Sequence, residues 1–425
     1  MFYRSIPQFL HWISIFIVLS QFWSFVFRPR PPPPPHGRWT FDPDHHANVH
    51  TLSQEQCDIA FPELYHSPKE SVKLRGNRRI MPRELEIAPG RCMMRLLIYD
   101  RELFIIDDGS PEKCYVKNGN ERERILGTLS QISLALATAP PSDPLPDIEF
   151  SITLDDLPRR SKLHGSFWAY TRKDGPAYDD VWLMPNYAYW SWNYTKAPSW
   201  QSIRRSIADT EQVTGWGAKH NKLVWRGKPK MADLRGDLLA MSAGKSWSDV
   251  KGVVINEHRD SSDLLTLEEF CGYRYTVQTE GTSYSGRLKY LQLCRSMLIS
   301  HPLEWQEFHT HLMTAEGEKP NFVETSPDWA NLDAIMEFYT TNPDVGEWIA
   351  GNAWELFHKR YLTSAAVTCY WRRLITSWAS VQGFTPMLYV DERGNKWEGR
   401  GKRKMRGEPF AAFAANWPAK PERLP

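Results

Sequence analysis

Between residues 222 and 300 the sequence alternates short β-branched or aromatic runs with segments of helical character. Strands separated by helices are typical of βαβ units, so this region predicts a mostly parallel sheet. The expected elements are strands at 222–225, 253–256 and 273–278, helical segments at 233–241 and 266–271, and, within 281–300, a small-residue loop, a helix at 287–295 and a final strand.

The rest of the chain predicts a second domain, because 425 residues exceed what one core usually serves. From Val345 onward, apolar residues at i, i+3 and i+4 spacing predict helices. Before residue 220 we expect paired strands at 93–99 and 103–106, a helix at 121–136, a strand at 148–154, an aromatic loop region at 165–200 and a helix at 202–214. The predicted division is 1–40, 41–205, 206–344, 345–382 for the C-terminal helices, and 383–425 for a basic tail.

The amino terminus predicts a membrane anchor. Residues 9–27 contain no Asp, Glu, Lys or Arg, and this length suffices to span about 30 Å of hydrocarbon as a helix. A Pro-rich stem follows at 28–35. Arg4 lies before the span and Arg28 and Arg30 after it, so the positive-inside rule barely decides the orientation.

Two other features favour a luminal body. The six cysteines form no C-x-x-C pair, which favours disulfides in an oxidising compartment over zinc. Asn193 begins a glycosylation sequon. We therefore expect a single-pass type II protein of the endoplasmic reticulum or Golgi, with residues 1–8 as its cytosolic tip.

Charge excludes one class of partner. The net charge of +2 gives no general attraction to nucleic acid. A basic run at 394–410 has two readings, a nuclear-localisation signal or a solvated tail, and the predicted membrane insertion favours the tail.

The stretch Gly281–Arg287 predicts an anion site. It joins an expected strand to an expected helix, whose N-terminal N–H groups favour a phosphate. Gly281 allows close approach, Ser283 and Ser285 can donate hydrogen bonds, and Arg287 can bind two oxygens. A tight turn with a surface arginine is the alternative.

A second basic turn follows the strand at 222–225. Arg226, Gly227 and Lys230 lie at or just after its end, and Arg235 lies further on. Two basic strand-to-helix turns in one domain suit a leaving group with two phosphates, as in a nucleotide-sugar.

Asp156 ends the strand of the first domain and is the candidate general base, with an ordinary Asp-Pro turn as the alternative. Two histidine clusters, at 42–50 and at His309 and His311, resemble metal ligands. We do not favour them, because the first lacks periodicity and the second would direct its rings apart on a helix.

Four motifs in order, Asp156-Leu157-Pro158, VWRG at 224–227, YTVQTEGTSYSGRLKYLQLCRSMLI at 275–299 and YWRRL at 370–374, together with Glu304-Trp305, resemble glycosyltransferase family 90. This family contains Rumi-type protein O-glucosyltransferases and fungal capsule-associated xylosyl- and glucosyltransferase-like proteins. The resemblance extends from about residue 147 to 379.

The resemblance implies an α/β, GT-B-like fold, with two Rossmann-like domains facing across a cleft and C-terminal helices crossing back. It implies transfer of a sugar from a UDP-sugar with inversion, without a metal held by Asp-x-Asp. It assigns the base to Asp156 and donor binding to Arg226, Ser285 and Arg287.

The resemblance also implies a disulfide between Cys271 and Cys294, which leaves Cys92–Cys114 and Cys57–Cys369 as the remaining pairs. Tyr187, Trp190 and Trp192, with Tyr189, are candidates for an acceptor-binding wall or for core packing.

Three departures from the family pattern, at Lys228, Asn186 and residues 321–324, leave the sugar (glucose or xylose) and the acceptor (glycan or glycoprotein) open. A membrane-anchored relative that has kept the fold as a binding or scaffold protein is the alternative to an enzyme.

Overall fold

The computed structural model describes residues 39–87, 92–109, 121–158, 165–192, 197–253, 263–399 and 401–416. It divides into the units Met1–Thr40 and Phe41–Pro425, and the fold below is that of the second unit. The predicted span at 9–27, the sequon at Asn193 and Cys114 lie outside the described residues. No helix within the described ranges is long and apolar enough to cross a membrane.

One lobe, here called the second lobe, contains a five-stranded parallel sheet in the order β10-β9-β8-β6-β7. When the five strands are numbered 1 to 5 in chain order and the sheet is read from β7, the order is 2-1-3-4-5. This is a doubly wound order, in which the direction of strand addition reverses between β6 and β8. The parallel sheet is confirmed, and it includes β7, which was not predicted; residues 254–256 of the strand expected at 253–256 lie outside the described residues. The strands are β6 (His220–Gly227), β7 (Ser248–Gly252), β8 (Tyr273–Gln278), β9 (Met297–Ser300) and β10 (Val323–Glu324).

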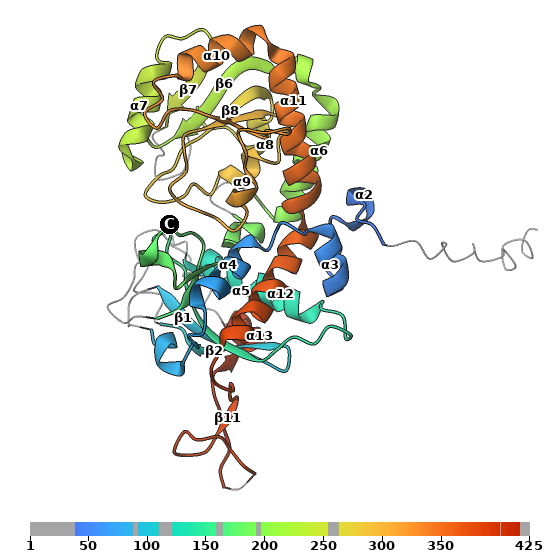
Figure 1. The fold of residues 1–425 in the computed structure, drawn as a ribbon, viewed down its shortest axis with the longest axis vertical. Helices are drawn as coiled ribbons and strands as arrows, with labels where there is room; N and C mark the ends of the chain where they lie inside the picture. Colours follow the sequence, from blue (N-terminus) through green and yellow to red (C-terminus); the bar gives the residue numbers. More distant parts are fainter. Residues whose placement is uncertain are drawn as a thin grey trace, which may run out of the picture. The chain divides into compact units, whose positions relative to one another are not determined.

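Helices cover both faces of this sheet because its side chains alternate between two apolar clusters. Leu223 and Trp225 face α7, α10 and α11, whereas Val224 packs with Phe270 and Leu288 of α8 and α9. Figure 1 shows α10 and α11 beside the strands. The helices are α7 (Asp233–Ser242), α8 (Leu267–Phe270), α9 (Leu288–Leu291), α10 (Leu332–Thr341) and α11 (Pro343–Ala353).

The first lobe contains a mixed sheet in the order β13-β2-β1-β3-β4-β5, in which only β3, β4 and β5 are parallel. Asp100 and Arg101 have φ values of 50° and 64°, so the two-residue turn between β1 and β2 forces an antiparallel hairpin. This lobe is therefore less regularly parallel than a Rossmann-like domain. The strands are β1 (Met93–Tyr99), β2 (Glu102–Asp107), β3 (Ile148–Thr153), β4 (Phe167–Ala169), β5 (Val181–Leu183) and β13 (Glu408–Pro409).

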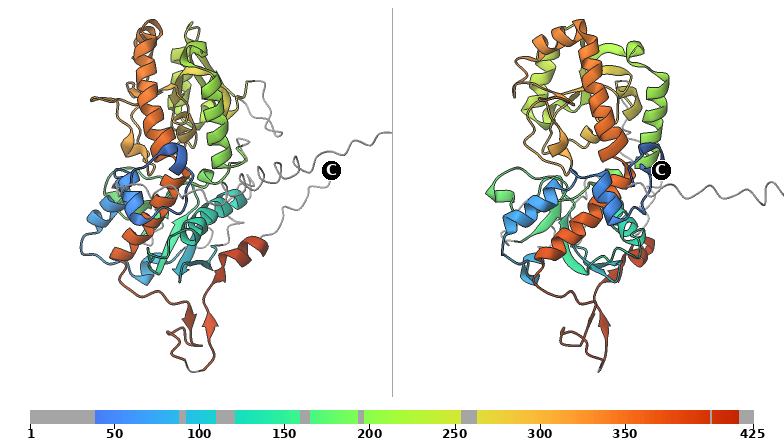
Figure 2. Two further views of the ribbon diagram at one scale, coloured as in Figure 1. Left: turned by 90° about the vertical axis from the view of Figure 1, so that its right-hand side faces the viewer. Right: turned by 45° about the vertical axis from the view of Figure 1, so that its right-hand side comes forward.

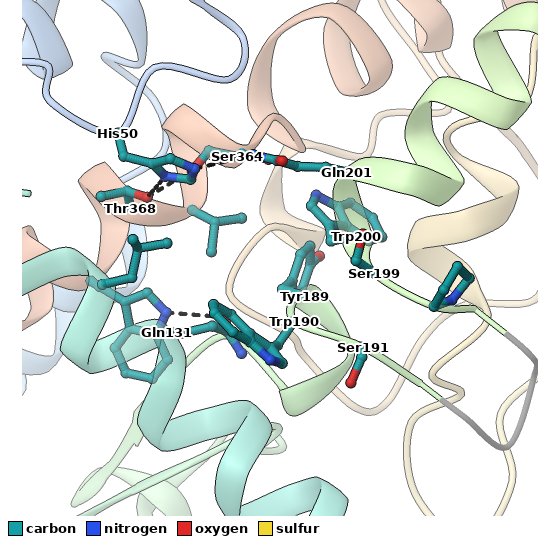
Figure 3. A pocket seen from close by; sticks show the side chains of 14 residues that line it. His50, Gln131, Tyr189, Trp190, Ser191, Ser199, Trp200, Gln201, Ser364 and Thr368 are labelled. Carbon is teal, nitrogen blue, oxygen red and sulfur yellow. Dashed lines mark hydrogen bonds between the residues drawn. The ribbon is translucent and has the colours of Figure 1, made fainter. Parts of the chain in front are cut away.

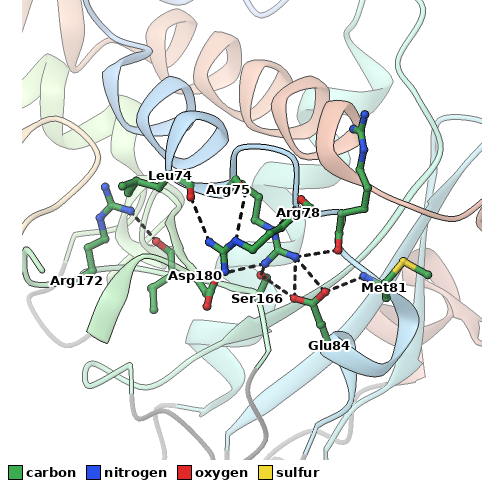
Figure 4. Close-up of polar contacts among 10 residues, drawn as sticks. Leu74, Arg75, Arg78, Met81, Glu84, Ser166, Arg172 and Asp180 are labelled. Atoms are coloured by element: carbon green, nitrogen blue, oxygen red, sulfur yellow. Dashed lines mark hydrogen bonds and ion pairs between the residues drawn. The ribbon is translucent and has the colours of Figure 1, made fainter. Parts of the chain in front are cut away.

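A buried arginine connects the helices of the first lobe to this sheet. Arg75, at the end of α4, is 4% exposed and donates to Ser166, Asp180 and Glu84 (Figure 4). Because three segments satisfy one desolvated guanidinium, its loss would leave buried charge unpaired. The helices of this lobe are α2 (Pro43–His46), α3 (Gln54–Ala60), α4 (His66–Arg75) and α5 (Glu121–Ala137), with the short helices η1 (Pro82–Leu85), η3 (Pro176–Tyr178) and η4 (Tyr187–Tyr189).

The chain passes to the second lobe through α6 (Trp200–Val213) and returns through α11, the π-helix η9 (Trp354–Tyr361) and α12 (Ser364–Val381). In α12, Trp371 donates to Gln131 and Trp378 to the carbonyl of Glu149, so this helix packs within the first lobe. The predicted return of the C-terminal helices is confirmed (Figure 1). The short helices of the second lobe are η6 (Trp216–Ala218), η7 (Pro229–Met231) and η8 (Thr310–Leu312).

The predicted solvated tail is wrong in part. After the hairpin β11 (Tyr389–Val390) and β12 (Lys404–Met405), β13 adds an edge strand to β2 and α13 (Phe410–Asn416) follows it. Figure 2 shows the hairpin extending from the first lobe. Arg406, from the basic run, donates to both carboxylate oxygens of Glu149, which is 1% exposed. The buried carboxylate of Glu149 thus binds Arg406, a cation that the sequence pattern predicts to be exposed to solvent.

Candidate active site

The carboxyl ends of β6 and β8 are neighbours at the point where the strand order reverses. In open parallel sheets, ligands bind in the crevice outside such ends. β6 ends at Gly227, and β8 leads into residues 279–287, here called the switch loop. The two basic turns predicted from the sequence therefore meet at one edge of one sheet.

Arg235 connects these two turns. Its Nε donates to Thr279 and to the carbonyl of Glu280, and its Nη1 lies 3.4 Å from the carbonyl of Lys228. A Cβ at Gly281 would stand 3.1 Å from Nη2 of Arg235, so glycine allows this close approach. Burial lowers the pKa of Arg235. Arg235 thus holds the switch loop through its side chain.

Arg287 ends the switch loop and is the N-cap of α9, and its guanidinium lies 5.2 Å from the ring centre of Phe270. The helix expected at 287–295 is wrong in length, because α9 spans only Leu288–Leu291. A single turn aligns few peptide dipoles, so the side chains and the loop carry the predicted anion site more than the helix does. Ser285 is half-buried beside Arg287.

Arg226 differs from the other two arginines because its guanidinium already has a protein partner. Its Nη2 donates to both carboxylate oxygens of Asp249 at 2.9 and 3.0 Å, and its Nε donates to the carbonyl of Asp263. Asp249 lies on the neighbouring strand β7 and also accepts from Tyr273. The structure therefore gives Arg226 a role in joining strand ends, and its predicted contact with the donor stays a prediction.

Asp156 follows β3 and is held by Arg124 of α5. Nη1 and Nη2 of Arg124 donate to Oδ1 and Oδ2 of Asp156 at 2.8 and 2.9 Å, a geometry that orients the carboxylate. The Asp156 side chain is 41% exposed, so its remaining lone pairs can be reached from solvent.

The switch loop contacts Asp156 from the second lobe. Ser283 donates to the backbone carbonyl of Asp156 at 2.8 Å, and the Tyr284 hydroxyl lies 3.4 Å from its Oδ1. A carboxylate of the first lobe and a glycine- and serine-containing loop of the second thus lie within hydrogen-bond reach, although 127 residues separate Asp156 from Ser283. The structure brings together the predicted base and the predicted anion-binding loop.

The sequence also matches a model of a known protein family. The model described as glycosyl transferase family 90 matches residues 111–393, more than half of the chain. The chain belongs to glycosyl transferase family 90. The matched range includes Asp156, the switch loop and α12.

The relatives of this family 90 chain include several O-glucosyltransferases. It is 27% identical over 263 residues to "O-glucosyltransferase rumi homolog" of Anopheles gambiae, covering 57% of this chain and 63% of the relative. It is 23% identical over 261 residues to "Protein O-glucosyltransferase 1" of Homo sapiens, with 55% and 63% covered. The chain spans about three fifths of the length of these curated relatives.

The aromatic side chains predicted to bind the acceptor have different surroundings. Tyr187 is 7% exposed and lies under the Arg124 guanidinium, and Trp192 stacks on Tyr290 at 5.8 Å. Trp190 is 41% exposed. Only Trp190 of the three predicted residues offers a large open ring surface.

Two buried titratable side chains of this family 90 site, Lys289 and Glu307, were not predicted from the sequence. Lys289 donates to the carbonyl of Gly286, and three aromatic rings surround its ammonium, those of Tyr189, Trp192 and Tyr290 at 5.1–5.5 Å. Burial lowers the pKa of Lys289. Its position two residues after Arg287 is a local signal that could have indicated it.

Glu307 carries the opposite charge. Its Oε1 accepts from Asn186 at 3.0 Å, and its Oε2 has no hydrogen-bond partner among the described residues. Burial raises the pKa of Glu307, and the charge of Lys289 opposes this shift. Asn186 is one of the departures from the family pattern, so its contact with Glu307 gives that departure a structural role.

Two of the predicted disulfides are present in the structure, Cys57–Cys369 and Cys271–Cys294. The first joins α3 to α12, and the second joins the end of α8 to the segment after α9. Cys92 is buried, and the pairing with Cys114 stays a prediction.

Two further predicted residues, Gly227 and Lys230, lie at the end of β6 or just after it. A Cβ at Gly227 would stand 2.5 Å from the Trp225 ring, so only glycine fits there without a shift. Lys230 is exposed on η7.

His309 contacts Gln292 and His311 contacts the carbonyl of Glu63, so their rings have separate partners.

Proposed function

We propose that the protein is an inverting glycosyltransferase that moves a sugar from a UDP-sugar to a hydroxyl group of a glycan or glycoprotein. The observation that carries the proposal is the contact of Asp156 with Ser283 and Tyr284, which combines a partly exposed carboxylate with the switch loop. Membership of family 90 supports the same chemistry.

In the proposed reaction, Asp156 takes the proton from the acceptor hydroxyl as its oxygen attacks the anomeric carbon. The bond from that carbon to the diphosphate oxygen breaks, and UDP leaves with the electron pair. Arg235, Arg287 and the switch loop stabilise the developing charge, an effect worth about several kcal/mol when the donors are preorganised. A single displacement with one base inverts the anomeric carbon.

Glucose is the favoured sugar because the relatives described above are named as O-glucosyltransferases. Xylose is the alternative, since it differs from glucose by one hydroxymethyl group and pocket shape decides between them. We propose that the reaction needs no divalent metal. We further propose a place in the secretory pathway, with residues 9–27 as a signal-anchor and the catalytic body in the lumen.

The test compares Asp156→Asn with Asp155→Asn in the full-length chain. Asp155 is adjacent, and its carboxylate accepts from the N–H of Leu157 rather than from Arg124, which makes it a matched control. We expect Asp156→Asn to lower UDP release from UDP-glucose or UDP-xylose by at least about 100-fold. Equal turnover by the Asp156→Asn variant and the parent contradicts the base assignment. Tight UDP binding without turnover in the parent supports the scaffold alternative.

A further inference from the structure

A cavity of about 370 Å³ lies where η4, the start of α6 and the start of α12 meet α5 (Figure 3). This volume falls within the range of about 300–1,000 Å³ that is usual for small-molecule sites. None of the residues described above as candidate donor ligands lines it. We call it the η4 pocket.

The η4 pocket is lined by uncharged side chains. Among the described residues that line it, none is Asp, Glu, Lys or Arg. The one titratable ring, His50, has its pKa lowered by burial and by the nearby charge of Arg372, so it is neutral at pH 7. A nucleotide, a phosphate or a charged peptide would have no counter-charge here, which favours a neutral ligand.

The lining combines apolar faces with polar groups. Trp190, which is 41% exposed, contributes most of the accessible aromatic surface, and the buried residues Tyr189, Trp200 and Trp371 complete the aromatic wall. A pyranose ring has the matching chemistry, because its C–H face packs on an aromatic ring while its hydroxyl groups extend outward.

The polar groups that could meet those hydroxyls come from three segments. His50 contacts Thr368 of α12 at 2.8 Å and Gln201 of α6 at 3.2 Å, and Gln201 is exposed (Figure 3). Ser364 is 5% exposed, and its hydroxyl has no hydrogen-bond partner among the described residues. An alkyl chain would leave the Ser364 hydroxyl unpaired, so the lining disfavours a lipid.

The η4 pocket and Asp156 are connected through α5. Arg124, which binds Asp156, and Gln131, which lines the pocket, are seven residues apart on this helix, or roughly 10 Å at 1.5 Å per residue. η4 packs along the same part of the helix, with Tyr187 at Arg124 and Trp190 in the pocket. Between these two positions Gly127 packs against the backbone of Tyr187, so an acceptor that reached both would pass outside this contact.

We propose that the η4 pocket binds a neutral saccharide unit of the acceptor, distinct from the unit that receives the transferred sugar. This assignment rests on the proposed function, because it takes the reaction to occur at Asp156. It makes Trp190 the stacking platform, with Gln201 and His50 as hydrogen-bonding partners, and it makes a glycan-bearing acceptor the substrate class.

The binding test uses saturation-transfer NMR on the full-length chain with excess UDP present, so that nucleotide occupies the donor site. The neutral probes are the methyl glycosides of glucose, galactose, mannose and xylose. Glucuronic acid, lysophosphatidylcholine and a serine-containing peptide represent the charged, lipid and protein alternatives. We expect saturation transfer to at least one neutral glycoside and none to glucuronic acid.

Two variants test whether the saturation transfer to neutral glycosides arises from binding in the η4 pocket. Trp190→Ala should lower it by at least about 5-fold, and Gln201→Ala, at an exposed position that tolerates substitution, by about 3-fold. Trp348→Ala is the matched control, because this tryptophan is 50% exposed and lies on α11, outside the pocket. No signal from any neutral glycoside overturns the proposal. So does an undiminished signal in both pocket variants, or binding of only the lipid or the peptide.

Turnover separates failure of this proposal from failure of the proposed function. If Asp156→Asn abolishes sugar transfer while both pocket variants bind glycosides like the parent, the enzyme assignment stands and the pocket proposal fails. If the pocket variants lose glycoside binding while Asp156→Asn turns over like the parent, the saccharide site stands and the proposed function fails.

Discussion

Arg124 binds both carboxylate oxygens of Asp156, at 2.8 and 2.9 Å, and is itself 8% exposed. The same guanidinium donates to the carbonyl of Leu154, so it connects the end of β3 to α5. The pair orients a carboxylate whose side chain remains 41% exposed. Arg124 is therefore a positioning residue for the proposed base.

Replacing Arg124 with lysine tests this positioning. Lysine keeps the positive charge but cannot donate two parallel hydrogen bonds, so the carboxylate should rotate. We expect kcat for sugar transfer to fall by about 10- to 100-fold with KM for the UDP-sugar little changed. Steady-state kinetics measures the split. A fall in the melting temperature with unchanged kcat would indicate a purely structural role, and Arg295→Lys, at an exposed ion pair with Glu347, is the control.

Arg226 and Asp249 allow a second prediction, because replacing Asp249 distinguishes a structural role of Arg226 from a donor-binding role. Arg226 is 4% exposed, and its side chain donates to the Asp249 carboxylate and to three backbone carbonyls, those of Trp225, Asp249 and Asp263. If the role is structural, Arg226→Met and Asp249→Asn should each lower the free energy of unfolding by about 3–5 kcal/mol, and the double variant by less than the sum. Urea unfolding measures this, and UDP affinity that changes only in Arg226→Met would instead support direct donor binding.

The sequence predicts those features of the structure whose residues lie within one short segment of the chain. The strand β8 was predicted with its observed bounds, and the switch loop was recognised from consecutive small residues and an arginine. In contrast, Asp249, the partner of Arg226, and Arg124, the partner of Asp156, lie 23 and 32 residues away on other elements, and no local sequence pattern predicts these pairs. The η4 pocket requires His50 and Thr368 to meet across 318 residues.

The same reasoning explains the errors. The hairpin turn at Asp100-Arg101 made the first sheet mixed, and buried Glu149 drew Arg406 out of the predicted solvated tail. The hairpin itself was predicted as the strand pair 93–99 and 103–106, and the mixed sheet departs only from the Rossmann-like domain that the family resemblance implies. The contact of Arg406 with Glu149, in contrast, depends on three-dimensional neighbours that a one-dimensional pattern does not contain. The two disulfides were predicted only through the family resemblance, since six cysteines allow fifteen pairings.

The disulfides supply a third prediction. Cys57–Cys369 closes a loop of 312 residues and Cys271–Cys294 one of 23, and all four cysteines are at most 1% exposed. Replacing either pair by alanines should lower the free energy of unfolding by about 2–4 kcal/mol, with the larger loss for the longer loop. Urea unfolding of the two double variants measures both. Loss of UDP binding only in the Cys271→Ala/Cys294→Ala variant would show that this bridge also supports the switch loop.

Glu280 in the switch loop gives a pH-dependent prediction. Burial raises its pKa from 4.5 to about 7, although the N–H groups of Trp305 and Glu304 donate to its carboxylate and oppose the shift. Between about pH 4.5 and 7 the folded protein therefore holds a proton that the unfolded chain releases, so the contribution of Glu280 to stability falls as pH rises.

Glu280→Gln removes this titration, and its amide oxygen can still accept the shorter hydrogen bond, from the Trp305 N–H, although the longer one from the Glu304 N–H is lost. We expect the variant to melt roughly 2–4 °C above the parent at pH 8, and the difference to vanish or reverse at pH 5. Melting curves of both proteins at the two pH values measure the change, and effects of other groups cancel in the comparison. Glu304→Gln is the control, since Lys173 lowers the pKa of this exposed carboxyl and its loss should not stabilise the protein at pH 8. A melting difference for Glu280→Gln that is independent of pH would mean that its carboxylate stays ionised in the folded protein.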